Sequence, residues 1–169
     1  MKLADVNAMS HVAFVATLGG IFEHSPWVAD RAYNARPFAS VGGLHEAMTR
    51  AVREAPAALQ LALIRAHPEL AGKAAGRGEL TADSTSEQSG AGLTQCTPDE
   101  FARLAALNAA YNENFGFPFI LAVRGRDRAA ILREFARRVV RDRDAEFKEA
   151  LTQIARIARL RLDALFADG

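Results

Sequence analysis

The chain has 169 residues, of which 50% are hydrophobic and 24% are charged. This composition suits one globular domain with a sizeable core and excludes general disorder. The formal net charge of +1 indicates no polyanionic partner, and the single cysteine, Cys96, excludes an internal disulfide and fits a reducing compartment.

The N-terminal region gives no sign of a membrane span or a secretory signal. The longest stretch without Asp, Glu, Lys or Arg runs from Val6 to Phe22 and contains several polar residues and glycines. It falls short of the ~20 mostly apolar residues that a spanning helix needs. Lys2, the only basic residue upstream, is offset by Asp5. We therefore expect a cytoplasmic protein with no membrane partner.

Helical spacing of apolar residues dominates the first part of the chain, and capping residues set the expected bounds. Asn7 is expected to cap a helix that runs to about Leu18, and Ser25-Pro26 to begin another that breaks before Pro37. The next helix is expected to follow Gly42-Gly43, with five apolar residues on one face: Leu44, Ala47, Met48, Ala51 and Val52.

A long polar segment follows a further helix, which is expected to start at Pro56 and to bury Leu59, Leu63 and Ala66. Residues 71–95 hold five glycines and six serines or threonines. Because segments of this composition rarely pack as regular elements, we expect the longest loop of the chain here.

The remaining chain shows helix signals with one interruption. Thr97-Pro98 opens a helix that is expected to end near Asn114. Residues 115–123 contain a glycine and a proline, so we interpret them as an extended, buried loop rather than a central strand. Asp127 and Asp144 are expected to cap two final helices. The sequence thus predicts one all-α domain over all 169 residues, with roughly seven to nine helices.

The basic residues are unevenly distributed. The stretch from Arg124 to Arg161 contains 12 basic and 6 acidic residues, a local net charge of +6, whereas residues 1–123 contain 9 basic and 12 acidic residues, a local net charge of −3. One interpretation is an all-helical interaction module that binds nucleic acid or an acidic partner. The other is a solvated helical face whose arginines form ion pairs with acids one helical turn away.

Generic metal and nucleotide motifs are incomplete. His45-Glu46 opens an H-E-x-x-H zinc pattern, but Thr49 occupies the position of the second histidine. Gly72-Lys73 resembles the end of a phosphate-binding loop, but Ala74 follows it. We therefore expect no metal and no nucleotide cofactor.

His67 is the first candidate for chemistry. Pro68 follows it and disfavours the α region for the preceding residue, which places the imidazole at a helix end or turn. Such a histidine either transfers protons, since imidazole titrates near neutral pH, or is a C-terminal residue favoured by the helix dipole. Glu87 and Gln88 lie in the predicted polar loop, where they either hold a polar ligand or are solvated.

Arg161 is the second candidate, because of its place on the last predicted helix. It lies seven residues after Ile154 and therefore within ~20° of it around the helix axis, whereas Arg156 and Arg159 point elsewhere. A guanidinium on an apolar stripe must pair with a buried acid or line a cavity. In the first interpretation it forms a structural ion pair. In the second its charge is uncompensated and anchors an anionic substrate.

Four blocks of sequence, taken together, resemble the OHCU decarboxylase family, which acts on 2-oxo-4-hydroxy-4-carboxy-5-ureidoimidazoline (OHCU). The blocks occur in family order, and a segment nearer the N-terminus, Phe22–Trp27, is also similar. They are His67–Lys73, Ser84–Leu93, Asn112–Ile120 with Ala122–Gly125, and Ile154–Leu162.

This resemblance implies an all-helical carboxy-lyase of urate degradation that converts OHCU into (S)-allantoin. The family acts on a small molecule, needs no metal or organic cofactor and commonly forms homodimers. The resemblance therefore implies the same for this chain, with no nucleic-acid partner. It makes His67, Glu87 and Arg161 the expected catalytic residues. The expected substrate contacts are Pro68, Ser84, Thr85, Ser86, Glu87, Gln88, Phe119, Ile120, Leu121, Ala122, Val123 and Arg161.

The resemblance also suggests a role for each group. His67 matches the proton donor, Glu87 either orients His67 or hydrogen-bonds the substrate, and Gln88 offers a donor and an acceptor to the ureido group. Arg161 suits a carboxylate or carbonyl oxygen because its guanidinium makes forked, charge-assisted contacts. An extended loop at Phe119–Val123 is expected to leave backbone N–H and C=O groups for the substrate, which a helix would not.

Overall fold

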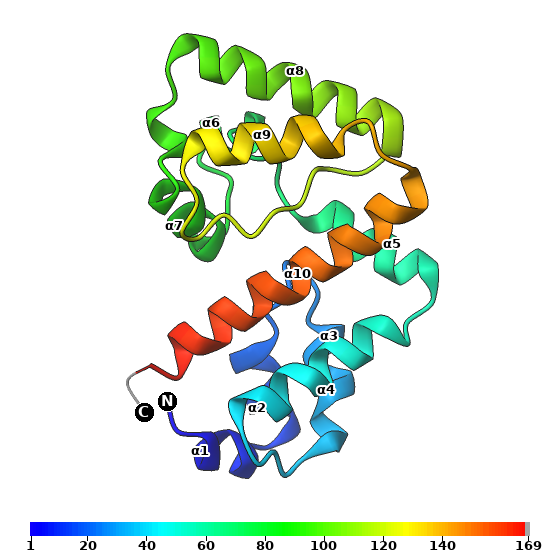
Figure 1. Cartoon of the computed structure of the whole chain (residues 1–169). Coiled ribbons are helices and arrows are strands. Elements are labelled where there is room, and N and C mark those ends of the chain that lie inside the picture. The colour runs from blue at the N-terminus through cyan, green and yellow to red at the C-terminus, as the bar shows by residue number, and fades with distance from the viewer. Residues whose placement is uncertain (168–169) are drawn as a thin grey trace. The chain divides into compact units, whose positions relative to one another are not determined.

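The computed structural model describes residues 1–167, and within them it contains ten α-helices, two short 3-10 helices and no strand (Figure 1). The all-α prediction is confirmed, with one helix more than the upper expected number. The chain divides into two compact units. One comprises Met1–Ala66 and the chain from Ile154 onward, and the other comprises His67–Gln153. The single domain over the whole chain stays a prediction.

The first unit is built from short helices around an apolar core. α3 packs against both α2 and α4, and the centre holds fully buried side chains that include Phe14, Leu18, Leu44 and Met48. Its elements are α1 (Leu3–Ala8), α2 (His11–Leu18), α3 (Trp27–Ala32), the 3-10 helix η1 (Tyr33–Ala35), α4 (Val41–Arg53), α5 (Ala57–Ala66) and the C-terminal part of α10 (Arg143–Leu165).

The start of the chain differs from the prediction that Asn7 caps one long helix. The helix ends at Ala8, and α2 begins after Ser10, whose Oγ accepts a hydrogen bond from the Ala13 N–H. The Asn7 amide instead makes two hydrogen bonds with the backbone of Phe38, one as donor and one as acceptor. Asn7 therefore joins two distant segments, a contact that no local pattern predicts.

The predicted apolar face of α4 is confirmed, since all five of its residues are buried. Gly42 and Gly43 lie inside the first turn rather than before it, because Ser40 is the N-cap and accepts a hydrogen bond from the Gly43 N–H. α3 begins at Trp27, one residue after the predicted proline position, and Pro26 precedes it in a helical conformation.

The second unit corrects the predicted long loop. Residues 82–90 form a helix because Thr81 acts as its N-cap and accepts a hydrogen bond from the Ser84 N–H. Glu87 and Gln88 are therefore helical residues. The elements of this unit are α6 (Lys73–Gly76), α7 (Ala82–Gly90), the 3-10 helix η2 (Leu93–Gln95), α8 (Pro98–Phe115), α9 (Arg128–Arg138) and the N-terminal part of α10.

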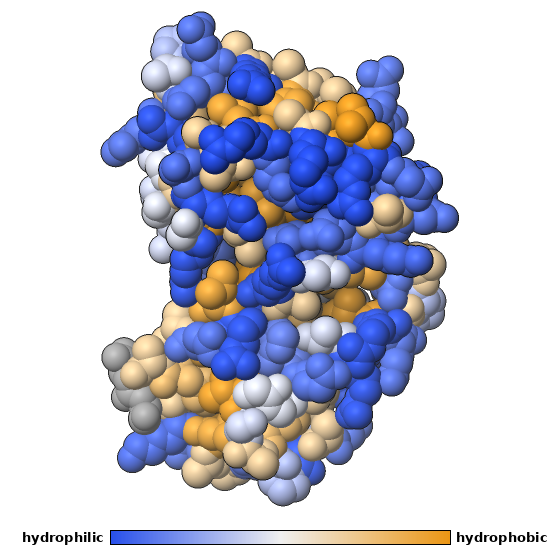
Figure 2. Space-filling model, in the orientation of Figure 1, coloured by the Kyte–Doolittle hydropathy of each residue, from blue (hydrophilic) through white to orange (hydrophobic). Residues whose placement is uncertain are grey.

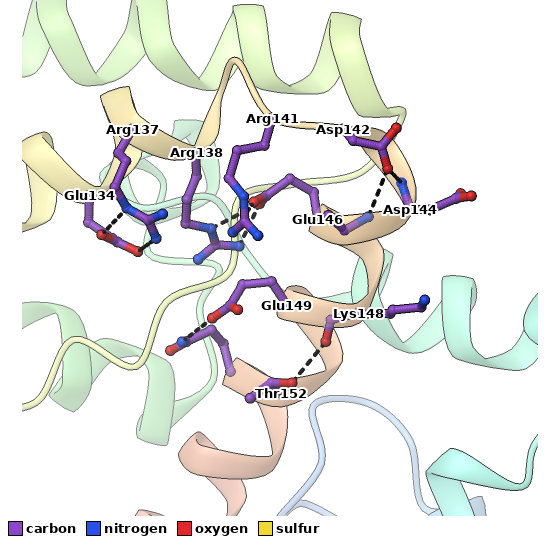
Figure 3. Close-up of polar contacts among 12 residues, drawn as sticks. Glu134, Arg137, Arg138, Arg141, Asp142, Asp144, Glu146, Lys148, Glu149 and Thr152 are labelled. Atoms are coloured by element: carbon purple, nitrogen blue, oxygen red, sulfur yellow. Dashed lines mark hydrogen bonds and ion pairs between the residues drawn. The ribbon is translucent and has the colours of Figure 1, made fainter.

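Two of the three predicted caps in this unit are confirmed. Thr97 and Glu100 form a reciprocal capping box at the start of α8, and Asp127 accepts from the Ala130 N–H at the start of α9. The prediction for α10 is wrong by two residues. Asp142, not Asp144, accepts the N–H groups of the first turn, as Figure 3 shows.

A cluster of aromatic rings forms the core of the second unit. Tyr111 lies at its centre, and its ring centroid is 4.4–6.0 Å from four phenylalanine rings. Phe119 and Phe135 stack at 3.8 Å. Residues 117–123 form neither helix nor strand, and nearly all of their side chains are buried. The prediction of a buried, non-helical loop over residues 115–123 is confirmed for residues 117–123, whereas Phe115 is the last residue of α8.

Many arginines in the basic stretch pair with carboxylates. The observed pairs are Arg128–Glu100, Arg137–Glu134, Arg138–Glu146, Arg141–Glu146 and Arg159–Asp163. Figure 2 shows hydrophilic residues along the visible side of α9. Arg137–Glu134 and Arg159–Asp163 lie one helical turn apart, as expected for a solvated face with ion pairs. The Arg138–Glu146 pair differs from that interpretation because both side chains are fully buried. Within residues 1–167, no helix is long and apolar enough to cross a membrane.

Candidate functional site

His67 lies at the end of α5, as its proline neighbour predicts. The helix ends at Ala66, and the His67 side chain is buried, with a residue exposure of 7%. Pro68 is half-buried. A buried imidazole at a helix end is shielded from bulk water, so the residues that hold this turn determine where it points.

Two amide side chains hold the backbone that follows His67. The Gln88 amide accepts from the Ala71 N–H at 2.9 Å and donates to the Glu69 carbonyl at 3.2 Å. From α8, Asn108 donates to the Leu70 carbonyl at 3.0 Å. These bonds hold three successive residues, 69–71, which begin two residues after His67 and are thereby attached to α7 and α8.

A carboxylate adds to this attachment. Asn112 donates to Glu69 Oε1 at 2.6 Å and to the Asn108 carbonyl at 2.9 Å. Asn108 and Gln88 are buried, at 5% and 4% exposure. A contact between Gln88 and the ureido group of a substrate stays a prediction. In the structure, the oxygen and the nitrogen of the Gln88 amide both bind the backbone of residues 69–71, which follow His67.

The predicted substrate residues of α7 fall on two sides of the helix. Ser84 and Gln88 are buried and Glu87 is half-buried, whereas Thr85 and Ser86 are exposed. The Thr85 hydroxyl donates to the Thr81 carbonyl, one turn earlier. Ser84, Glu87 and Gln88 share a face because residues three and four apart are neighbours on a helix. Of the five residues, these three are the ones turned toward the protein.

A pocket of about 550 Å³ lies between α6, α7 and the start of α8. It is mostly apolar, and two of the predicted substrate residues, Thr85 and Gln88, belong to its lining. As far as the described residues go, the lining contains neither His67 nor Glu87. Within the same residues no group of three His, Cys, Asp or Glu side chains is arranged to hold a metal ion.

The predicted substrate segment Phe119–Val123 is held through its backbone. The Ile120 carbonyl accepts from Arg138 Nη1 at 2.8 Å, and the Ala122 N–H donates to Gln153 Oε1 at 3.0 Å. The Ala122 carbonyl accepts from Arg126 Nε. The expectation that an extended loop leaves its backbone groups for the substrate is therefore not met at the Ile120 carbonyl and the Ala122 N–H, which bind buried side chains of α9 and α10. The Ala122 carbonyl binds the exposed Arg126 instead.

Arg161 lies in the first unit and forms a buried ion pair there. Its Nη1 is 2.8 Å from Glu23 Oε2, and the two side chains are 4% and 1% exposed. The same nitrogen approaches the carbonyls of Gly20 and Ile21 at 3.5 Å. The expectation that its charge is uncompensated is wrong. The structural ion pair is present, and a role toward substrate stays a prediction.

The projection of the neighbouring arginines is confirmed. Arg156 and Arg159 are exposed, and Arg159 pairs with Asp163, four residues further along α10. Arg161 alone of the three is buried. Helical geometry therefore identified the buried guanidinium but not its partner, since Glu23 lies in a turn with no periodic pattern.

Several residues at these sites escaped the sequence analysis, and one had a detectable signal. Arg138 lies seven residues after Ile131 and three after Phe135, both buried, so it projects from an apolar stripe as Arg161 does. The others are Glu23, Asn108, Glu146 and Gln153.

Comparison with known proteins assigns the chain to a class. The solved structure of an (S)-allantoin synthase matches 97% of this chain and 54% of its own, with a TM-score of 0.79 and 29% identity. A solved OHCU decarboxylase crystallised in the presence of (S)-allantoin matches 83% of this chain and 91% of its own, with a TM-score of 0.69 and 22% identity, which shows a shared fold. The fold is thus that of a small all-helical class of enzyme.

Sequence comparison is more specific. The family model for OHCU decarboxylase matches residues 7–163. A 2-oxo-4-hydroxy-4-carboxy-5-ureidoimidazoline decarboxylase from Haloferax volcanii is 42% identical over 99% of this chain and 97% of its own, and one from Mus musculus is 41% identical over 98% and 93%. A uric acid degradation bifunctional protein from a Bacillus species is 41% identical over the whole chain, which spans 33% of that protein. The chain belongs to the OHCU decarboxylase family.

Proposed function

We propose that this protein decarboxylates OHCU to (S)-allantoin, as a cytoplasmic homodimer without a cofactor. The observation that carries the proposal is family membership over residues 7–163 together with a buried His67, which precedes a segment hydrogen-bonded to α7 and α8. The interaction-module alternative is not favoured, because the relatives are named as decarboxylases and many of the arginines on which it rests are paired.

The substrate supplies its own electron sink. Its carboxylate leaves as CO₂ from C4, which also bears the hydroxyl and is bonded to C5 of the ring C=N bond. The electron pair of the broken C–C bond forms a C4=C5 double bond, and the C=N electrons move to the ring nitrogen, which takes up one proton. The C4 hydroxyl then becomes a carbonyl as it loses its proton, and C5 gains a proton on one face. The protein therefore has to orient the carboxylate, stabilise the developing charge and deliver the proton to one face.

His67 is the proton donor in this proposal. Imidazole titrates near neutral pH, and a buried donor held in one orientation delivers its proton to one face of the ring. Glu87, half-buried on α7, orients the imidazole or hydrogen-bonds the substrate. Pro68, Ser84, Thr85, Ser86 and Gln88 contribute the remaining contacts of this part of the chain.

Arg161 is the proposed anchor for an anionic substrate oxygen. Its ion pair with Glu23 fixes the orientation of a guanidinium whose forked N–H donors match the geometry of a carboxylate. The segment Phe119–Val123 contributes backbone contacts, as family resemblance implies.

The decisive experiment is a chiral assay on freshly generated OHCU. The expected product is (S)-allantoin formed faster than the spontaneous decay, which yields the racemate. Activity is expected to survive exhaustive chelation and dialysis. Racemic product at the spontaneous rate would refute the proposed function, and loss of activity that only an added metal restores would refute cofactor independence. Sedimentation across a range of concentrations tests the homodimer, which a monomer at assay concentrations would exclude.

A further inference from the structure

A buried cluster of charged side chains contacts the segment Phe119–Val123. Arg138, on α9, is fully buried, and its guanidinium donates from Nη1 to the Ile120 carbonyl at 2.8 Å. The same group lies 4.5 Å from the centre of the Phe119 ring. Arg138 therefore contacts the segment twice, through a hydrogen bond to the Ile120 carbonyl and a cation–π contact with the Phe119 ring.

Glu146, on α10, orients this guanidinium. Arg138 Nε donates to Glu146 Oε2 at 2.9 Å, and Figure 3 shows the two side chains directed at one another. Arg141 lies 3.0 Å from the other oxygen of the carboxylate, and the Tyr111 hydroxyl donates to Glu146 at 2.6 Å. Burial and this hydrogen bond raise the pKa of Tyr111 far above its usual range, so the hydroxyl remains a donor.

A second buried side chain holds the same segment two residues further on. Gln153 is 2% exposed, accepts from the Ala122 N–H at 3.0 Å and donates to Glu149 Oε1 at 2.7 Å. In an extended backbone, residues two apart direct their N–H and C=O groups to the same edge, and the residue between them to the opposite edge. Arg138 and Gln153 thus hold one edge, and Leu121 belongs to the other.

We propose that Arg138 and Gln153 are positioning residues that aim the Leu121 N–H and C=O at the substrate. They do so by fixing the Ile120 carbonyl and the Ala122 N–H on the opposite edge. In the part of the chain that the structure describes, no hydrogen bond involves the backbone of Leu121. This inference rests on the proposed function, because it needs a substrate for the second edge to contact.

The test uses Gln153→Leu, which keeps the size of the side chain and removes the acceptor for the Ala122 N–H. Misplacement of a substrate-contacting group by about 1 Å typically costs about 100-fold in rate. We expect kcat for (S)-allantoin formation to fall about 10- to 100-fold. The KM is expected to change less than threefold, since the other substrate contacts remain.

The control for this variant is an exchange of the two side chains, Glu149→Gln with Gln153→Glu. The exchange restores an acceptor for the Ala122 N–H and reverses the hydrogen bond between residues 149 and 153. It is expected to bring kcat back to within threefold of wild type. Thr152→Leu, at an exposed neighbouring position, is expected to leave kcat unchanged. Gln153→Ala repeats the test should the leucine variant fail to fold.

Two results would overturn the inference. One is a folded Gln153→Leu or Gln153→Ala variant with wild-type kcat and KM. The other is a loss of kcat that the exchange fails to restore, which would show general damage to the fold. Failure of the proposed function is a separate outcome, because it appears as wild-type protein that forms no (S)-allantoin above the spontaneous rate.

Discussion

At the scale of single residues, the buried charges are the informative feature. Arg138 pairs with Glu146 and Arg161 with Glu23, and all four side chains are at most 5% exposed. Replacing a buried pair with apolar residues is often neutral, whereas removing one partner is strongly destabilising. Such pairs thus add little net stability but restrict the positions of the groups they join, as an active site requires.

His67→Asn is the direct test of the proton donor. Asparagine keeps some hydrogen bonding and removes the titrating imidazole, so turnover is expected to fall ~10²–10⁴-fold, the usual contribution of general acid–base catalysis. The measurement is kcat, with circular dichroism to verify the fold. His24→Asn is the control, because His24 is exposed and its φ of 46° suits asparagine. Near wild-type turnover in folded His67→Asn would remove His67 from the mechanism.

Arg161→Met separates the structural role of this arginine from its proposed role toward substrate. The change removes the counter-charge of buried Glu23, and breaking such a pair typically costs about 3–5 kcal/mol. The single variant is expected to be destabilised by about this amount, measured by urea unfolding.

The double variant Arg161→Met with Glu23→Gln removes both charges, and we expect it to recover most of the lost stability. If Arg161 anchors the substrate, the double variant stays inactive although it is folded. Arg159→Met, which breaks an exposed pair, is the control and is expected to retain both stability and activity. Full activity in the folded double variant would restrict Arg161 to a structural role.

At the scale of helices, N-terminal caps place the elements that carry the site. The Thr81 side chain starts α7, which presents Ser84, Glu87 and Gln88 on one side. Thr97 and Glu100 start α8, which supplies Asn108 to the His67 segment. Because each cap determines where its helix begins, it also determines which side chains face the His67 turn.

The capping box of α8 predicts a pH dependence of stability. The hydrogen bond from the Thr97 N–H, followed by contacts with Arg128, lowers the pKa of Glu100 below its ordinary value of 4.5. A lowered folded-state pKa contributes stability that is fully present above the unfolded-state pKa and lost as the pH falls through the folded-state value.

The stability difference between wild type and Glu100→Gln is therefore expected to be constant from about pH 5.5 to 7 and to shrink below about pH 4.5. Urea midpoints across this range provide the measurement. Thr97→Ala, the comparison variant, removes an uncharged acceptor and is expected to cost about 0.5–2 kcal/mol at every pH. A difference for Glu100→Gln that grows on acidification would contradict the assignment.

At the scale of the whole molecule, the distribution of charge bears on partners. Among the described residues, at least six arginines of the stretch from Arg124 to Arg161 pair with carboxylates, and the formal net charge is only +1. Proteins that bind nucleic acid through phosphate contacts rely on unneutralised cations and lose affinity steeply with salt.

We expect no measurable binding to single- or double-stranded nucleic acid at physiological salt, as tested by fluorescence anisotropy. Titration at low salt serves as the comparison, because weak nonspecific attraction appears there first. A complex that persists at physiological salt and weakens with a steep salt dependence would revive the interaction module as a function of this chain.

Local patterns in the sequence determined most of the helices. The buried face of α4 and the caps at Thr97 and Asp127 were predictable, because apolar spacing and side-chain caps involve residues within one or two turns. The position of His67 at a helix end followed from the proline after it. The family was predictable as well, since four blocks occur in family order along the chain.

Tertiary structure decided the partners of the polar groups. Residues 82–90 have a weak helical pattern and the composition of a loop, yet they form a helix that Thr81 caps and that buries Ser84 and Gln88. Nothing local links Arg161 to Glu23, Asn108 to the Leu70 carbonyl, or Gln153 to the Ala122 N–H, because each pair is far apart in the sequence. A sequence can show that a buried polar group needs a partner, but only the folded chain brings that partner within hydrogen-bonding distance.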